Sequence, residues 1–226
     1  MKVTLTRVTT DPVMAIEEAA ANCYDSTPSP AGKIMKHCYT SGHTSVMEFC
    51  EFTFHIEGVS RALLAQLTRH RHANYAVRSQ RYVDESGFEY VIPATIRTSE
   101  LATEYCELME EIRAFFVKAT EMGIPNEDAR YVLPNSCHTV LEFKINLRSL
   151  LNFMNLRLCT RAQWEIRQLA IAMKKEIVSQ YPVFEKYLVP KCEVNAPYNF
   201  CTEQKCCGKH PKLKEVYKKY AESRNS

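Results

Sequence analysis

The chain has 226 residues, of which 46% are hydrophobic and 24% are charged. This balance excludes disorder over most of the length, and the 6 glycines exclude collagen-like and glycine-linker architectures. The chain has 29 lysines and arginines and 26 aspartates and glutamates, so its formal net charge is +3. A net charge this small indicates no class of partner by itself.

Hydrophobic periodicity and turn residues divide the chain into strand and helix patterns. In chain order they predict a strand over 3–8, helices over 12–21 and 31–40, a strand over 51–56, a helix over 61–68, a strand over 90–92, helices over 99–122 and 127–132, a strand over 139–144, and helices over 146–159 and 162–181. The strands do not alternate regularly with helices, so repeated βαβ units are not indicated.

Local signals support several of these boundaries. Asp11 and Pro12 suit the N-cap and first turn of the first helix, and Ser60 suits the N-cap of the third. Gly58 is expected to end the second strand, and Gly123 to cap the longest helix at its C-terminus. The apolar residues of that helix recur at spacings of three and four, at Leu101, Tyr105, Leu108, Ile112, Phe115 and Ala119.

The sequence predicts an α+β fold: one compact domain over residues 1–190, with long central helices and a small mixed or antiparallel sheet. Beyond residue 190 the periodicity is lost, so residues 191–226 are expected to form a tail. That tail contains Cys192, Cys201, Cys206, Cys207 and His210. Their spacing fits no standard zinc finger, so we expect no metal site and a loosely ordered, reduced tail.

Targeting signals are not apparent. The start of the chain lacks the apolar stretch and small-residue cleavage site of a signal peptide. No apolar run approaches the ~18–20 residues that a bilayer helix needs. A cytoplasmic protein without a membrane partner is therefore expected, with its 10 cysteines reduced.

The segment from Ser60 to Tyr82 has an unusual charge composition. It contains no aspartate or glutamate, but it contains five arginines at positions 61, 69, 71, 78 and 81 and histidines at 70 and 72. Guanidinium groups bind phosphates with two parallel hydrogen bonds, so the segment favours an anionic ligand. Two alternatives stay open: these arginines pair with glutamates elsewhere, such as those of the 99–122 helix, or they bind nucleic acid. The absence of lysine argues against nucleic acid.

The predicted helix over 146–159 is the second unusual element, because residues 145–164 contain no lysine, aspartate or glutamate. Its apolar stripe consists of Leu147, Leu150, Leu151, Met154 and Leu158. On a helical wheel Arg148, Asn152 and Asn155 lie to one side of this stripe, and Asn146 and Arg157 to the other. Amides and guanidiniums offer donors to the phosphates and ring carbonyls of a nucleotide or flavin. A helix at a subunit interface is the alternative.

Several ordered motifs carry a family resemblance. Arg69-His70-Arg71, seven further residues and Ser79 match an RHR-x7-S signature. The matching blocks around it are Gly42–Ser45, Phe52–Phe54, Arg130–Pro134, Asn146–Arg157 and Ala162–Ile166. Over residues 1–190 the sequence resembles the flavin-dependent thymidylate synthases. Val77 stands where several members carry an acidic or amide residue, Phe49 where a histidine is frequent, and Arg161 where some members have histidine.

The resemblance implies a compact α/β unit that assembles as a homotetramer, with FAD and dUMP bound at subunit interfaces. It implies synthesis of dTMP from dUMP, with 5,10-methylenetetrahydrofolate as one-carbon donor, NADPH as reductant of the FAD, and release of tetrahydrofolate. The residues implied for dUMP are Gln66, Arg69, Ser79, Gln80, Arg81, Arg130 and Arg157. Those implied for FAD are Ser45, Arg69, His70, Arg71, Asn146, Arg148 and Asn152.

Two positions carry a particular role by resemblance. His43 would lie near the entrance for flavin and folate, and Arg157 would stabilise negative charge on the uracil ring as the catalytic residue. Ser79 lacks a local base, so we favour substrate hydrogen bonding over nucleophilic attack. A nucleic-acid-binding module and a general NADPH–flavin oxidoreductase are the competing functions. A dinucleotide fold of the Gly-x-Gly-x-x-Gly kind is not indicated.

Overall fold

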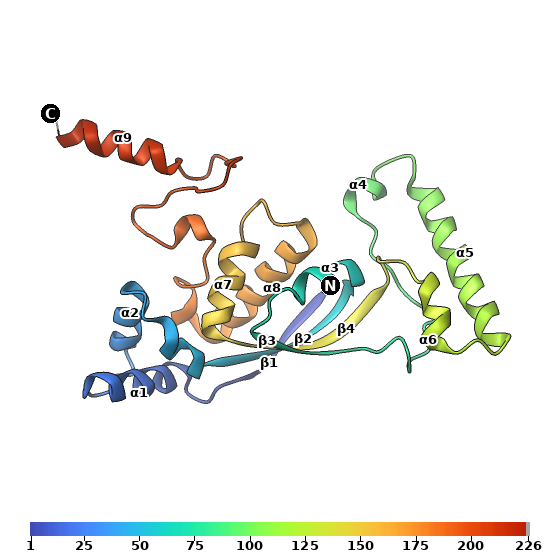
Figure 1. Ribbon diagram of the computed structural model, residues 1–226, viewed down its shortest axis with the longest axis horizontal. Coiled ribbons are helices and arrows are strands. Elements are labelled where there is room, and N and C mark those ends of the chain that lie inside the picture. The colour runs from blue at the N-terminus through green and yellow to red at the C-terminus, as the bar shows by residue number, and fades with distance from the viewer. Residues whose placement is uncertain (225–226) are drawn as a thin grey trace. The chain divides into compact units, whose positions relative to one another are not determined.

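The computed structural model describes residues 1–224 (Figure 1). Its strands are β1 (Lys2–Val8), β2 (Glu51–Ser60), β3 (Ala73–Val77) and β4 (His138–Asn146). Its α-helices are α1 (Pro12–Tyr24), α2 (Lys33–Thr40), α3 (Arg61–Leu67), α4 (Ala94–Arg97), α5 (Ala102–Glu121), α6 (Asn126–Ala129), α7 (Leu147–Arg157), α8 (Trp164–Gln180) and α9 (Leu213–Arg224). Short 3-10 helices include η1 (Thr44–Phe49), η2 (Arg130–Val132), η3 (Pro182–Phe184) and η4 (Lys191–Glu193).

The four strands form one sheet in the order β1-β2-β4-β3. Strands β2 and β4 run antiparallel: the imidazole of His55 lies 2.6 Å from the carboxylate of Glu142, and Glu51, earlier in β2, pairs with Lys144, later in β4. Strand β3 also runs against β4, since Tyr75 stacks on Phe143 while the amide of Arg78 donates to the carbonyl of Val140. The predicted α+β class and small antiparallel sheet are confirmed.

By compactness the chain divides into two units. The first consists of Met1–Thr4 and Phe54–Phe143, and the second of Leu5–Thr53 and the chain from Lys144 onward. Strands β1, β2 and β4 each contribute residues to both units. The predicted division into a domain over 1–190 and a tail over 191–226 stays a prediction.

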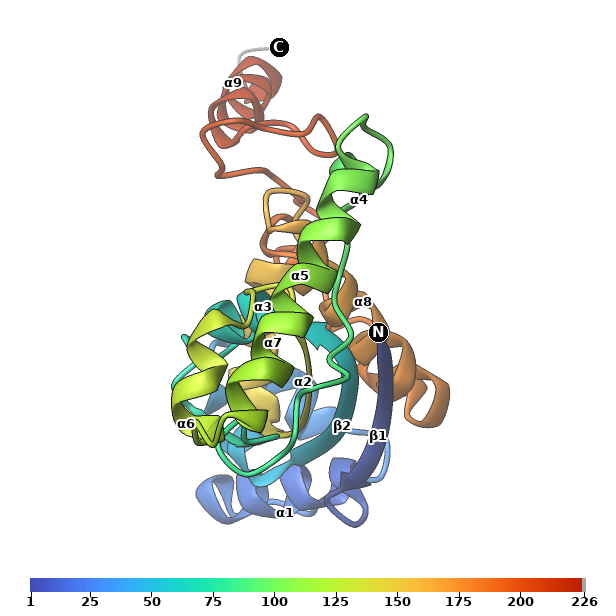
Figure 2. The same cartoon turned by 90° about the vertical axis from the view of Figure 1, so that its right-hand side faces the viewer.

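In the first unit, helix α5 packs beside α6, as Figures 1 and 2 show. Its buried residues are Met109, Phe116 and Ala119, of which the last two cluster with Ala129. At its C-terminus Gly123 adopts a φ of +83°, and the amides of Gly123 and Ile124 donate to the carbonyls of Thr120 and Ala119. This is a Schellman motif, so the predicted glycine cap is confirmed.

The expected apolar stripe of α5 is only partly buried. Ala119 is buried, but the side chains of Leu101, Leu108 and Phe115 are 59%, 49% and 57% exposed, and Met122 is 72% exposed. These four residues follow one another at intervals of seven along the helix and its two flanking residues. The described residues of this unit therefore leave one apolar face of α5 uncovered.

In the second unit, η1, α1, α2, α7 and α8 pack around buried aromatic and aliphatic side chains. Phe52 meets Phe184 edge to face, with ring centroids 5.6 Å apart. Helix α7 buries Leu147, Leu150, Leu151, Phe153 and Met154, so most of the predicted stripe is confirmed, whereas Leu158 is only half-buried.

Polar caps fix three helix starts. The side chain of Ser60 accepts from the amide of Leu63, that of Asn146 from the amide of Ser149, and that of Gln163 from two amides of α8. The Ser60 cap was predicted from sequence and is confirmed. Asp11 has the predicted N-cap position, but its side chain makes no capping hydrogen bond.

Four expectations about elements were wrong. Gly58 does not end β2, because a φ of +68° lets the chain continue as strand to Ser60. Residues 90–92 form only a bridge between Tyr90 and Cys137. Strand β3 lies unpredicted within the arginine segment, and helix α9 lies within the expected irregular tail. Among the described helices none is long and apolar enough to cross a bilayer.

Candidate functional site

The acid-free segment forms α3, β3 and the connections around them in the first unit. The turn that carries Arg69 and Arg71 is held by Tyr75, whose hydroxyl donates to the carbonyls of Leu67 at 2.9 Å and His70 at 2.7 Å. Burial of this phenol raises the pKa of Tyr75 to about 12, so it remains a donor at neutral pH. A half-buried tyrosine therefore fixes the backbone of an exposed cationic turn.

The arginines of this segment fall into two groups. Arg78 pairs with the buried Glu85 at 3.3 Å, and Arg81 pairs with Glu127 at 2.9 Å. In contrast, Arg69 and Arg71 are exposed and have no ion-pair partner within residues 1–224. The alternative in which these arginines pair with carboxylates of the chain is thus correct for Arg78 and Arg81. Neither of their acidic partners lies on α5.

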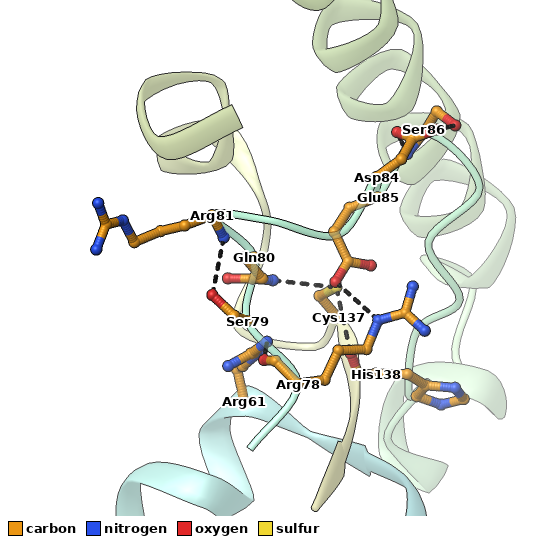
Figure 3. Close-up of polar contacts among 10 residues, drawn as sticks. All are labelled: Arg61, Arg78, Ser79, Gln80, Arg81, Asp84, Glu85, Ser86, Cys137 and His138. Carbon is orange, nitrogen blue, oxygen red and sulfur yellow. Dashed lines mark hydrogen bonds and ion pairs between the residues drawn. The ribbon is translucent and has the colours of Figure 1, made fainter. Parts of the chain in front are cut away.

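Figure 3 shows the loop after β3, where the predicted dUMP residues Ser79, Gln80 and Arg81 follow one another. The hydroxyl oxygen of Ser79 accepts from the amide of Arg81 at 3.3 Å, and the amide of Gln80 donates to the sulfur of Cys137 at 3.7 Å. The side chain of Arg81 points away from this group (Figure 3). Whether Ser79 binds the substrate stays a prediction.

Arg61 supports this loop from α3. Its Nη2 donates to the carbonyl of Arg78 at 2.8 Å, while its Nε lies buried without a hydrogen-bond partner among the described residues. Burial lowers the pKa of Arg61, with weaker electrostatic contributions from neighbouring groups. The arginine segment therefore already holds a partly desolvated cation next to the predicted dUMP residues.

Among the other predicted residues of this unit, Gln66 is half-buried on α3 and His70 is half-buried in the turn. Arg130 opens η2, and its Nε donates to the carbonyl of Glu127 at 3.0 Å. The same Glu127 thus contacts both Arg81 and Arg130 through different atoms.

The second unit carries the other predicted group. Arg148 on α7 pairs with Glu48 of η1 at 2.6 Å, and η1 packs against α7. Ser45 of η1 and Asn152 of α7 are exposed, as is His43 at the N-cap of η1. Asn146 uses its side-chain oxygen to cap α7, so its amide nitrogen is the group it could offer to a ligand.

Arg157 lies at the C-terminal end of α7, where it lines a cavity of about 260 Å³ in the second unit. It is half-buried, and desolvation lowers its pKa. Asn155, which the helical wheel placed on the other side of the stripe, lines the same cavity with a buried, unsatisfied Oδ1. Arg157 and Asn155 both line this cavity because the cavity lies around the C-terminal end of α7 and residues 158–162, which follow the helix.

The structure thus groups the predicted site residues by unit. The first unit holds Gln66, Arg69, His70, Arg71, Ser79, Gln80, Arg81 and Arg130, and the second holds His43, Ser45, Asn146, Arg148, Asn152 and Arg157. Sequence reasoning missed the carboxylates Glu48, Glu85 and Glu127, which neutralise arginines of the two groups. Glu127 and Glu48 lie 46 and 100 residues from Arg81 and Arg148, so no local signal could have identified them, whereas Glu85 follows Arg78 by only seven residues.

Comparisons with known proteins agree on one family. The family model described as "Thymidylate synthase complementing protein" matches residues 4–183. Flavin-dependent thymidylate synthases of Clostridium tetani and Geobacter sulfurreducens are each 37% identical to the chain, cover 96% of it, and are themselves covered over 97% and 98%. The crystal structure of thymidylate synthase X from Helicobacter pylori with FAD and dUMP matches with a TM-score of 0.68 and 28% identity, over 83% of this chain and 99% of that one. The predicted enzyme class is confirmed: this chain belongs to the flavin-dependent thymidylate synthase family.

Proposed function

We propose that this protein synthesises dTMP from dUMP, with 5,10-methylenetetrahydrofolate as one-carbon donor and NADPH-reduced FAD as hydride source, and releases tetrahydrofolate. The observation that carries the proposal is the pair of exposed arginines, Arg69 and Arg71, in a turn fixed by Tyr75 and without ion-pair partners in the described chain. Cations held in this way complement nucleotide phosphates.

For dUMP we propose contacts from Gln66, Arg69, Ser79, Gln80, Arg81, Arg130 and Arg157. The phosphate is a dianion near neutral pH and attracts guanidinium groups strongly in a site that excludes water. Arg81 would exchange its carboxylate partner for the ligand. This exchange costs little, because the two side chains of the Arg81–Glu127 pair are 49% and 50% exposed, and such pairs contribute roughly 0–1 kcal/mol.

For FAD we propose contacts from Ser45, Arg69, His70, Arg71, Asn146, Arg148 and Asn152, with His43 near the entrance for flavin and folate. The donor set fits an anionic cofactor, since it combines hydroxyl, amide and guanidinium donors without a carboxylate among them. Arg148 can leave its half-exposed partner Glu48 as Arg81 can leave Glu127. When bound, FAD supplies the hydride.

Arg157 is our proposed catalytic residue. Its guanidinium is partly desolvated, and desolvation lowers its pKa, so an adjacent negative charge would stabilise the cation. From this partly desolvated position the guanidinium of Arg157 would donate hydrogen bonds to the uracil ring. These bonds would stabilise the negative charge that develops on the ring during the reaction. A planar guanidinium also holds the ring in one orientation, which an ammonium would not do as well.

We further propose that the active protein is a homotetramer whose sites are shared between chains. The uncovered apolar face of α5, formed by Leu101, Leu108, Phe115 and Met122, supports contact with a second copy. Two antiparallel copies of α5 would set Leu108 against Phe115 of the partner and bring Glu104 within one turn of the partner's Lys118. Such an interface is isologous, as most dimeric contacts within tetramers are.

The free state of all ten cysteines supports a cytoplasmic location.

The test is formation of dTMP by the purified protein, with dUMP, methylenetetrahydrofolate, NADPH and FAD omitted in turn. Loss of product in every omission is the expected result. NADPH oxidation that proceeds at full rate without dUMP, and without dTMP as product, would instead identify a general NADPH–flavin oxidoreductase. Protein that binds duplex DNA but retains no flavin would support the nucleic-acid-binding alternative.

A further inference from the structure

Three metal-ligating side chains lie together in the second unit. Cys192 and Glu193 are neighbours in η4, and His210 belongs to the connection between η4 and α9. The Cys192 sulfur, a Glu193 oxygen and a His210 ring nitrogen all lie within 4.8 Å of one another. Among the residues that the structure describes, no other cysteine, histidine, aspartate and glutamate side chains form a group of three with this spacing. Three different ligand types at this spacing suggest a site for a metal ion.

The spacing of the three ligand atoms matches the geometry of a zinc ion. The ring Nε2 of His210 lies 3.3 Å from Oε1 of Glu193. Zinc binds nitrogen and oxygen at about 2.0–2.2 Å, so a tetrahedral ion holds two such ligand atoms about 3.3 Å apart. A sulfur ligand, at about 2.3 Å from the ion, lies about 3.6 Å from the other two ligand atoms. Because the Cys192 sulfur is already within 4.8 Å of both atoms, a movement of about 1 Å completes the arrangement.

Hydrogen bonds hold the backbone on both sides of His210. The thiol of Cys206 donates to the carbonyl of His210 at 3.3 Å, and the amide of Cys201 donates to the carbonyl of Pro211 at 2.8 Å. The other two ligands come from η4, which is itself an ordered 3-10 helix. The two segments that supply the ligands are therefore positioned by contacts that do not depend on a bound ion.

The three side chains are partly shielded from water. Those of Glu193 and His210 are 22% and 19% exposed. Burial raises the pKa of the Cys192 thiol, and the nearby carboxylate of Glu193 raises it further. Glu193 also pairs with Lys209, whose side chain is 59% exposed and can turn into solvent. A divalent cation attracts a thiolate and a carboxylate together more strongly than an ammonium does, so it would replace Lys209 at this position.

One side of the group faces a cavity. Cys192 and His210 both line the cavity of about 260 Å³ beside the end of α7. The thiols of Cys159, Cys201 and Cys207 line it as well, but none of them belongs to the group with metal-ligand spacing. An ion held by the three side chains would therefore keep its fourth coordination position for a water molecule from the cavity.

We propose that Cys192, Glu193 and His210 bind a zinc ion, with water from the cavity as the fourth ligand. Zinc accepts sulfur, nitrogen and oxygen ligands at one site and has no redox chemistry of its own. As the sulfur–zinc bond forms, the thiol releases its proton to solvent, so the step needs neither an oxidant nor a reductant. The thiolate and the carboxylate offset the two positive charges of the ion, and the imidazole binds in its neutral form.

The ion would join two segments of the chain. Glu193 and His210 are 17 residues apart, so a metal that links them closes this loop and attaches the segment before α9 to η4. The expectation of a metal-free tail rested on the spacing of four cysteines and a histidine, and it did not include a carboxylate as a ligand. The fold brings a different set of three residues together.

The first experiment measures the zinc affinity of the full chain by competition with a chromophoric chelator. The wild type should bind zinc in equimolar amount. Cys192→Ser, Glu193→Gln and His210→Gln should each weaken binding about tenfold or more, since even the loss of a group that supports a ligand has an effect of that size. The matched controls Cys159→Ser and Glu203→Gln remove a thiol and a carboxylate from the lining of the cavity, and they should leave zinc affinity unchanged. Retained affinity in Glu193→Gln or His210→Gln, or an equal loss in the controls, would overturn the ligand set.

A second experiment needs no variant, so it remains decisive where a variant fails to fold. X-ray absorption at the zinc edge of the wild-type protein should give one sulfur at about 2.3 Å, and nitrogen and oxygen neighbours at about 2.0–2.2 Å. A shell of four sulfurs, or a shell without sulfur, would overturn the proposal. So would wild-type protein that binds neither zinc nor cobalt(II), because the three side chains would then be held by hydrogen bonds and ion pairs alone.

Discussion

Replacing Arg157 by alanine removes a half-buried guanidinium at the end of α7. Burial lowers the pKa of Arg157 by desolvation, so keeping the guanidinium charged in the folded protein has a cost that alanine removes. We expect a change in unfolding free energy of about 1 kcal/mol or less, which corresponds to roughly 2–4 °C in Tm for a chain of this size. Hydrogen bonds to charged groups contribute about 1.5–3 kcal/mol, so dUMP affinity should fall roughly tenfold to a hundredfold.

Catalysis should fall as well, because the proposed interaction strengthens as charge develops on the ring. Removing one such donor typically slows the chemical step by about 10²–10³. The assay is single-turnover oxidation of reduced flavin at saturating dUMP, together with dUMP affinity. Arg157→Lys should recover charge and part of the affinity but little of the rate, since an ammonium lacks the planar geometry.

The matched control is Lys191→Ala, which removes an exposed cation from the same cavity. It should leave dUMP affinity and the single-turnover rate close to those of the wild type. A rate near the wild-type value in Arg157→Ala at saturating dUMP would refute a catalytic role and leave at most a binding one. Equal losses in both variants would attribute the effect to the net charge of the cavity instead.

Three further predictions follow from particular residues. Arg71→Ala should lower flavin content in the purified protein more than it lowers dUMP affinity, as absorbance and calorimetry would measure; unchanged flavin content with lost dUMP binding would contradict the assignment to FAD. Phe115→Glu should dissociate the assembly in light scattering, because it places a charge in the uncovered face of α5, and a tetramer that persists would exclude that face as the interface. Burial raises the pKa of Cys50 to about 12 and that of Cys137 to about 11, so both remain protonated near neutral pH. Iodoacetamide followed by mass spectrometry should therefore modify the exposed Cys207 and Cys23 first, with Cys50 and Cys137 reacting only as the pH rises towards those values.

The parts of the fold that the sequence predicted well are those governed by local physics. Periodicity located α1, α5, α7 and α8, and the caps at Ser60 and Gly123 follow from hydrogen bonds within a few residues. The failures concern tertiary context. Gly58 continues a strand because its neighbours pair on either side, and β3 forms because β4 offers an edge to an otherwise polar segment. Neither condition is visible in the segment itself.

The residue set of the candidate site stays a prediction, and the arrangement of these residues could not be derived from the sequence. The acid-free segment and the helix from Asn146 identified the arginines and amides that offer donors. Two of their carboxylate partners lie far along the chain: Arg81 and Glu127 are separated by 46 residues, and Arg148 and Glu48 by 100. The same limit hid the cavity at the end of α7, since residues 155–162 and the C-terminal segment line it together only through the fold.

Pairing with internal carboxylates and binding of an anionic ligand are compatible roles for the same arginine. The pairs Arg81–Glu127 and Arg148–Glu48 are each about half exposed, so each contributes roughly 0–1 kcal/mol and is weakened by salt. A phosphate held in a site that excludes water contributes about 1.5–3 kcal/mol for each charged contact. We therefore expect the ligand to displace the carboxylate. In contrast, Arg78 faces Glu85, whose side chain is only 5% exposed, and leaving that carboxylate buried without its partner would be costly. Among the arginines of the acid-free segment, Arg81 is thus available for exchange, whereas Arg78 is committed to the structure of the loop.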